Sequence, residues 1–152
     1  MVDRISRRIG LGSLAVAAAT VSAQAQPVGE REQVVYHLNQ PGGENFAYYR
    51  QLLVNLRNHI ETLAGVEFDL RLVMHGAGLG LLRVAAKADT QVAASVDNLK
   101  LAGVRFEICR ITLRSNNIRL DELYDATETD LVPSGVVQLA RLQRQGFSYI
   151  KI

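Results

Sequence analysis

The chain contains a single cysteine, Cys109, within the segment VRFEICRITL at residues 104–113. One thiol cannot close an internal disulfide, and it cannot build a zinc site that needs several thiolates. A thiolate is a strong nucleophile, whereas a buried thiol packs as a small apolar side chain. The sequence leaves both interpretations of Cys109 open.

Two residues that the predicted fold places near Cys109 could promote formation of a thiolate. His75 follows a predicted strand and is a candidate proton acceptor for the thiol. Arg110 follows the cysteine directly, and a cation at that position lowers the pKa of a thiol. Residues 111–116 are expected to form a helical turn whose free N–H groups face the sulfur. His75 is equally explained as a strand-end histidine that only forms hydrogen bonds.

Other motifs give no support for a metal or an organic cofactor. His37 and His59 have no partner at metal-ligand spacing. The glycines at 76–80 do not match G-x-G-x-x-G, so we expect a tight turn there instead of a dinucleotide site. The acidic residues within 121–130 are typical of a solvated face. We therefore expect no metal and no cofactor.

The elements that position these residues alternate between β-rich runs and helical periods. Strands are expected at 33–39, 66–75, 104–109, 129–133 and 147–152. Helices are expected over 46–63, 79–88, 90–102, 111–116 and 136–145, with Asn45, Thr90 and Ser134 as caps of the first, third and last.

This alternation predicts a three-layer α/β/α sandwich around a mostly parallel five-stranded sheet. Ligands of such sheets bind beyond the carboxyl ends of the strands. The predicted strand ends bring Cys109, His75 and two Gly-rich loops to one edge. The candidate site is therefore a crevice at that edge.

Length and composition fit one domain. The chain has 152 residues, of which 48% are hydrophobic and 21% are charged. That is enough for one substantial core and too little for two domains. The two signs of charge are interspersed, which excludes a disordered, highly charged chain.

Residues 1–25 have the layout of a cleavable signal peptide: a basic start, an apolar run of small residues and an Ala-Gln-Ala site. The pair Arg7-Arg8 is typical of a twin-arginine signal, and a general secretory route stays open. The apolar run is too short to span a bilayer. We expect a linker at 26–32, a domain at 33–152 and a periplasmic location.

Removing this segment takes away three of the 17 basic residues and one of the 15 acidic residues, which leaves the remaining chain formally neutral. Nucleic-acid binding needs a concentrated positive surface. We therefore exclude nucleic acids as partners.

The segments HGAGL, FEICRITL and LVPSGVVQLARLQRQGFSYIKI make residues 33–152 resemble the DsrE/DsrF-like family, most closely its exported members. The resemblance implies a five-stranded sandwich that assembles as a homo-oligomer, often a trimer or hexamer, or as a hetero-oligomer of related subunits. It also implies a persulfide-carrying cysteine at the end of the third strand, without metal or organic cofactor. Cys109 occupies that position, which makes it the expected sulfur acceptor between donor and acceptor proteins.

Alternatives remain beside this hypothesis. The characterised sulfur-relay proteins of the family work in the cytoplasm, whereas this chain carries the layout of an export signal. The bulk of residues 110–113 is also expected to bury the sulfur. One alternative is an oligomeric binding or scaffold protein with a structural cysteine. A weaker one is a small-molecule binder that uses the loops at Gly42-Gly43 and 76–80. The sequence does not decide whether the protein is an enzyme.

Overall fold

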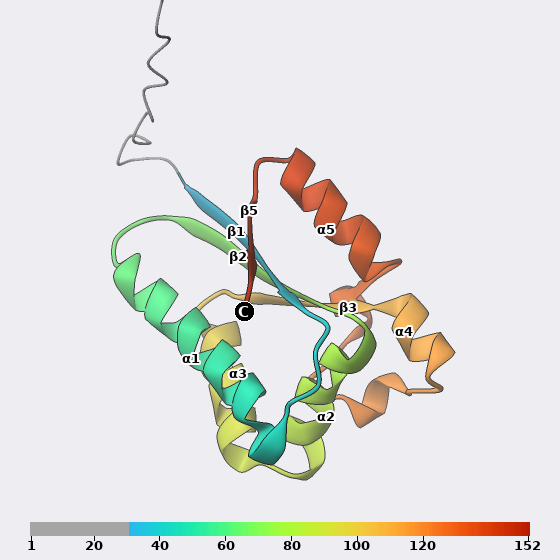
Figure 1. The fold of residues 1–152 in the computed structure, drawn as a ribbon. Coiled ribbons are helices and arrows are strands. Elements are labelled where there is room, and N and C mark those ends of the chain that lie inside the picture. The colour runs from blue at the N-terminus through green and yellow to red at the C-terminus, as the bar shows by residue number, and fades with distance from the viewer. Residues whose placement is uncertain (1–30) are drawn as a thin grey trace, which may run out of the picture.

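The computed structural model describes residues 31–152, so the predicted signal peptide at 1–25 and most of the predicted linker at 26–32 lie outside the described residues. The strands of the described part are β1 (Glu32–Leu38), β2 (Phe68–Met74), β3 (Arg105–Cys109), β4 (Leu131–Val132) and β5 (Ser148–Lys151). They form one all-parallel sheet in the order β4-β3-β2-β1-β5 (Figure 1). The predicted five-stranded sheet is confirmed.

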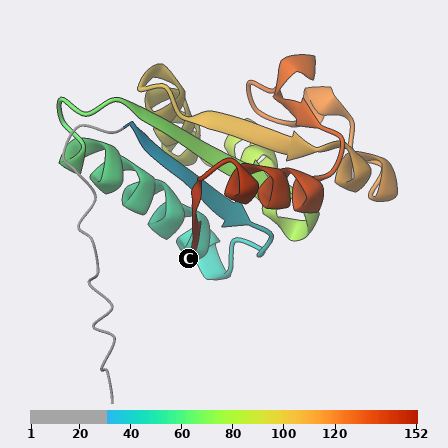
Figure 2. The same cartoon turned by 90° about the horizontal axis from the view of Figure 1, so that it is seen from above.

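Helices cover both faces of this sheet. The α-helices of the described part are α1 (Ala47–Thr62), α2 (Gly80–Lys87), α3 (Thr90–Leu101), α4 (Arg110–Ser115) and α5 (Gly135–Arg144). Helices α1, α2 and α3 lie on one face and α5 lies on the other (Figures 1 and 2). The predicted three-layer sandwich is therefore confirmed. Within residues 31–152, no helix has the length and apolar character needed to cross a membrane.

Strand β2 lies at the centre of the sheet and contributes to two separate cores. Leu70, Leu72 and Met74 are fully buried in the larger core, beneath α1, α2 and α3. On the opposite face, Val73 packs with Val35 and the apolar side of α5 in a smaller core. Successive side chains of a strand point to opposite faces, so both layers are anchored on the same strands.

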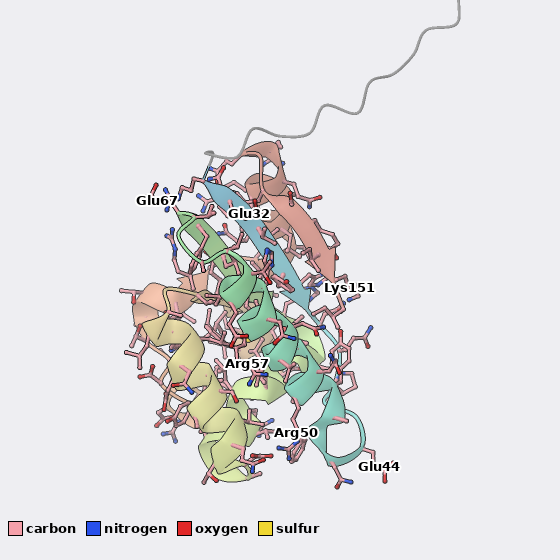
Figure 3. The ribbon with its side chains drawn as sticks, turned by 90° about the vertical axis from the view of Figure 1, so that its left-hand side faces the viewer. Glu32, Glu44, Arg50, Arg57, Glu67 and Lys151 are labelled. Atoms are coloured by element: carbon pink, nitrogen blue, oxygen red, sulfur yellow. The ribbon has the colours of Figure 1, made fainter. Side chains whose placement is uncertain are left out.

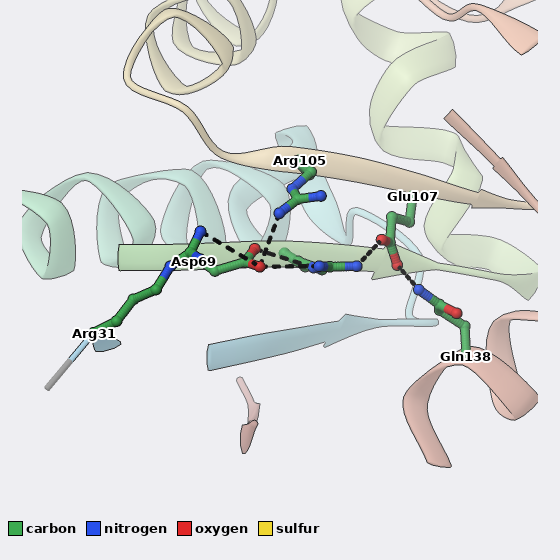
Figure 4. Close-up of polar contacts among 6 residues, drawn as sticks. Arg31, Asp69, Arg105, Glu107 and Gln138 are labelled. Carbon is green, nitrogen blue, oxygen red and sulfur yellow. Dashed lines mark hydrogen bonds and ion pairs between the residues drawn. The ribbon is translucent and has the colours of Figure 1, made fainter. Parts of the chain in front are cut away.

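Charged side chains occupy the rest of the face under α5. The Arg71 guanidinium binds both carboxylate oxygens of Asp69, at 3.0 and 2.9 Å, and one oxygen of Glu107 at 3.0 Å. Arg105 adds a 2.8 Å contact to Asp69. The other oxygen of Glu107 accepts a 2.7 Å hydrogen bond from Gln138 of α5 (Figure 4). Because these buried carboxylates are paired, the network can hold α5 against β3 without an isolated buried charge.

The start of α1 differs from the prediction. Phe46, and not Asn45, precedes the helix, and it has a left-handed φ of 58° and makes no side-chain cap. The prediction of an Asn45 cap was wrong because Asn45 itself lies in a short turn with φ of 50°. The predicted cap of α5 is confirmed, since the Ser134 hydroxyl accepts the N–H of Val137 at 3.4 Å.

The start of α3 also differs by one residue. Asp89 is the cap, and its carboxylate accepts two N–H groups of the first turn at 2.9 and 3.1 Å. Thr90 is the first helical residue, so the prediction of a Thr90 cap was wrong. The same carboxylate binds Arg50 of the neighbouring α1 at 2.5 Å. Figure 3 shows Arg50 beside α3. A carboxylate that caps one helix and binds the next explains why Asp outcompetes Thr here.

Candidate functional site

Three neighbouring strands end level with one another, as the sequence predicts. His37 lies one residue before the end of β1, His75 directly follows β2, and Cys109 is the last residue of β3. The parallel register pairs Leu38 with Met74, the last residues of β1 and β2. The candidate residues therefore come from adjacent strands at the carboxyl edge of the sheet.

Cys109 lies where two helices begin. It is the N-cap of α4, which confirms the helical turn predicted after the cysteine, and it is 4% exposed. The Cys109 side chain makes no cap hydrogen bond to the first turn of α4, but the Thr112 hydroxyl and the N–H groups of Gly135, Thr112 and Ile111 lie near enough to lower the pKa of its thiol. Gly135 is the first residue of α5, and the other two N–H groups belong to the first turn of α4. The free N–H groups of two helix starts therefore converge on one sulfur atom.

These donors set the electrostatics of the thiol. Burial by itself raises the pKa of Cys109, because a buried anion loses its water. The Thr112 hydroxyl and the nearby backbone N–H groups lower it further than burial raises it. The net result is a pKa below the usual value of a cysteine. The thiolate, which is the nucleophilic form, is therefore favoured at this position.

Thr112 joins the loop after β2 to the start of α4. Its buried hydroxyl accepts the N–H of Gly76 at 2.9 Å and lowers the pKa of the Cys109 thiol. Gly76 has a φ of 53°, a conformation that favours glycine. It begins the short 3₁₀ helix Gly76–Leu79, which confirms the tight turn predicted for the Gly-rich segment. This turn thus helps to hold the hydroxyl that contacts the sulfur.

Gly135 brings α5 into contact with both candidate residues. A Cβ atom at Gly135 would lie 3.0 Å from the Cβ of His75 and 3.3 Å from the Cβ of Cys109. Contacts this short are tighter than most, so a larger residue would require α5 or its neighbours to shift by a few tenths of an ångström. The same distances show that His75 and Cys109 are neighbours, as the predicted strand ends required.

His75 begins a row of hydrogen-bonded polar side chains. Its Nε2 lies 2.7 Å from Nε2 of His37, whose Nδ1 lies 2.6 Å from the Tyr149 hydroxyl. Burial, the charge of Lys151 and the proximity of His75 lower the pKa of His37 to about 4. Burial and then Lys151 also lower the pKa of His75. Both imidazoles are therefore neutral at pH 7.

Arg110 has a different partner. Its guanidinium binds Glu128 at 3.1 Å, and both side chains are exposed. The structure thus places His75 beside Cys109 and engages Arg110 in a surface ion pair. The role of Arg110 as an anion stabiliser stays a prediction.

Comparison with known proteins identifies the family. A model of the DsrE/DsrF-like family matches residues 35–152. The chain belongs to the DsrE/DsrF-like family. The protein of unknown function MTH1491 from Methanobacterium thermoautotrophicum is 28% identical, with a TM-score of 0.67 over 80% of this chain and 99% of that chain. The ychN protein from E. coli shares the fold at 18% identity, with a TM-score of 0.57 and the same two coverages. No curated protein matches.

In this DsrE-family chain, the sequence prediction missed three contributors to the site. Thr112 and Gly135 carry no motif, because their roles depend on how α4 and α5 meet the sheet edge. His37 was set aside for want of a metal-ligating partner, yet it pairs with His75 from the adjacent strand. A histidine at the end of each of two neighbouring parallel strands is the signal that points to this pair.

Clusters of metal-ligating side chains were sought among residues 31–152. In this range, no group of three or more His, Cys, Asp or Glu side chains is arranged to hold a metal ion. In the acidic segment 121–130, exposed carboxylates form surface ion pairs, as with Lys100 and Asp125. That agrees with the predicted solvated face.

Proposed function

We propose that this protein is a periplasmic sulfur carrier in which Cys109 accepts sulfane sulfur and passes it to a partner thiol. The supporting observation is the place of Cys109 at the end of β3, between the first turn of α4 and Gly135 of α5. The Thr112 hydroxyl and the backbone N–H groups there lower the thiol pKa in spite of burial. Family membership supports the same chemistry, because the resemblance implies a persulfide-carrying cysteine at the end of the third strand.

The proposed step is a sulfane-sulfur exchange. The Cys109 thiolate attacks the outer sulfur of a polysulfide or persulfide, so a new S–S bond forms at Sγ and the S–S bond of the donor breaks. The electron pair of the broken bond leaves with the remaining donor sulfur, which takes up the proton that the Cys109 thiol lost. No external oxidant or reductant is needed. Attack by a partner thiolate on the outer sulfur repeats the exchange and regenerates Cys109.

The neighbours of Cys109 have separate roles in this proposal. The Thr112 hydroxyl and the backbone N–H groups stabilise the anionic sulfur. His75, which is neutral at pH 7 and lies beside Cys109, is the proton acceptor. Arg110 contributes only if its guanidinium leaves Glu128.

A surface for partner proteins adjoins the site. Ile111 at the start of α4, and Val136 and Val137 at the start of α5, are 46%, 61% and 62% exposed. Exposed apolar side chains at the starts of the two helices that flank Cys109 are suited to protein contact. They support the proposed sulfur donors and acceptors, and also assembly with further copies or related subunits.

Mass spectrometry of the protein after exposure to inorganic polysulfide tests the carrier role. We expect a mass increase of one or more sulfur atoms on Cys109, removed by a thiol reductant. The Cys109→Ser protein should show no increase. If the wild-type chain gains no sulfur under conditions in which a small-molecule thiol does, the carrier proposal fails.

A structural role for the cysteine is the second candidate, favoured by the 4% exposure of Cys109. This candidate is an oligomeric binding or scaffold protein in which the thiol only packs. It requires that Cys109 reacts with iodoacetamide only after unfolding, and that Cys109→Ala preserves cellular function. The carrier requires alkylation of the native protein at neutral pH, so this one measurement separates the two candidates.

A further inference from the structure

His37 and Tyr149 take no part in the sulfur exchange described above, yet consecutive hydrogen bonds connect them to His75. The Nε2 atoms of the two histidines lie 2.7 Å apart, and Nδ1 of His37 lies 2.6 Å from the Tyr149 oxygen. At one end of this row, His75 adjoins Gly135 and Cys109. At the other end, Tyr149 is 42% exposed. The row therefore leads from the buried sulfur site to the surface of edge strand β5.

One proton lies between the Nε2 atoms of the two imidazoles. The protons of the row can then be placed in two orders, each of which gives every hydrogen bond one donor and one acceptor. In the first order, His75 donates from Nε2 to His37, which donates from Nδ1 to Tyr149, so Nδ1 of His75 is an open base. In the second, Tyr149 donates to His37, which donates to Nε2 of His75, whose Nδ1 is protonated. Passage from the first order to the second takes up one proton at His75 and releases one at Tyr149.

We propose that His75, His37 and Tyr149 form a proton relay that serves the sulfur exchange at Cys109. This inference rests on the proposed function and adds two positioning residues, His37 and Tyr149, which act through His75. As the Cys109 thiol becomes a thiolate, its proton goes to Nδ1 of His75. The Nε2 proton of His75 moves to His37, and the Nδ1 proton of His37 leaves by way of Tyr149. The reverse passage returns a proton to the departing sulfur.

The charges around the row keep it ready to accept a proton. Lys151 lies two residues beyond Tyr149 on β5 and pairs with His37 across the strands, and its ammonium binds the side chain of Asn39. Burial and this positive charge lower the pKa of both histidines, that of His37 to about 4. Two protonated rings would place like charges in direct contact. Close to pH 7 the pair is therefore neutral and, in the first order, leaves Nδ1 of His75 open to accept a proton.

The test measures the rate of persulfide formation on Cys109 from inorganic polysulfide between pH 5 and 9. It compares His37→Gln, His37→Phe and Tyr149→Phe with the wild-type chain. Glutamine can hydrogen-bond Nε2 of His75 but does not titrate, so it preserves position and not proton transfer. We expect both His37 variants to lose about tenfold or more in rate at pH 7, since proton transfer by a positioned side chain contributes about 10²–10⁴-fold. Added imidazole should restore part of the rate of His37→Phe.

The outcomes separate the relay from the proposed function. If the wild-type chain forms the persulfide and folded His37→Gln matches its rate and pH profile, the relay is refuted and the carrier role stands. If the wild-type chain forms no persulfide, the carrier role fails. In that case, ¹⁵N NMR of the histidine rings measures which ring nitrogens carry protons. We expect both rings to be neutral at pH 7, with only one of the two facing Nε2 atoms protonated, and any other state refutes the row.

Discussion

Replacing Thr112 by valine removes one hydroxyl from the sulfur site and preserves the shape of the side chain. The lost hydroxyl accepts the N–H of Gly76 at 2.9 Å and lowers the pKa of the Cys109 thiol. We expect it to donate a hydrogen bond to the thiolate. A hydrogen bond to a charged group contributes about 1.5–3 kcal/mol, and one pKa unit corresponds to about 1.4 kcal/mol. The Thr112→Val thiol should therefore have a pKa raised by about one to two units. The unpaired N–H of Gly76 should lower stability by about 1–3 kcal/mol.

The rate of alkylation by iodoacetamide as a function of pH measures this pKa. Because the chain has one cysteine, the whole signal comes from Cys109. Thr112→Ser retains the hydroxyl and serves as the control, with a pKa near that of the wild-type chain. If folded Thr112→Val, checked by thermal unfolding, titrates at the wild-type pKa, the hydroxyl does not stabilise the thiolate and our reasoning about the site is wrong.

Four further changes test other parts of the structure. Gly135→Ala places a Cβ atom 3.0 Å from a neighbouring carbon. Urea unfolding should show a loss of about 1–3 kcal/mol, and alkylation should show a raised thiol pKa; an unchanged pKa would contradict the role of the Gly135 N–H. Gln138→Leu removes the 2.7 Å donor to buried Glu107, which should lower stability in urea by about 1–3 kcal/mol; full wild-type stability would show that the bond is dispensable. The pKa of His37 is about 4 when folded and 6.5 in its ordinary state, so the unfolded chain binds more protons between these values and stability falls as the pH drops from 6.5 to 4. His37→Phe should reduce this dependence of the melting temperature on pH, and an unaltered dependence would assign it to other groups. Arg110→Ala should leave the thiol pKa unchanged in the alkylation assay, because the guanidinium binds a surface carboxylate; a clear rise would restore its predicted role at the sulfur.

The sheet was predictable because its strands are short apolar runs closed by turn residues. The run at 33–39 became β1 (Glu32–Leu38), shifted by one residue. The run at 129–133 shortened to β4 (Leu131–Val132), because Glu128–Asp130 form a 3₁₀ turn with a capping box. Local hydrogen bonds of polar side chains compete with strand pairing, and propensity alone does not reveal which of them wins.

The site was only partly predictable for a related reason. The rule that parallel strands end at one edge was sufficient to place His75 near Cys109. The position of Gly135 depends instead on how α5 packs on the other side of the sheet. That packing uses the Glu107–Gln138 hydrogen bond between residues 31 positions apart. No periodicity within α5 reveals such a contact, so the approach of the Gly135 N–H to Cys109 could not be predicted from the sequence.

Helix α5 lies against Cys109 as well as the segment that follows it. Among residues 110–113, Arg110 and Ile111 are exposed, whereas Thr112 and Leu113 are buried. Gly135 at the start of α5 lies directly against Cys109 from the other side. Helix α5 is held by the smaller core and by the Gln138 hydrogen bond, so its first turn can open at a lower free energy than the larger core. Such an opening would admit a sulfur donor and at the same time withdraw the Gly135 N–H from the thiolate. Loss of this donor raises the thiol pKa, so the movement that gives access to Cys109 also lowers the fraction of thiolate near pH 7.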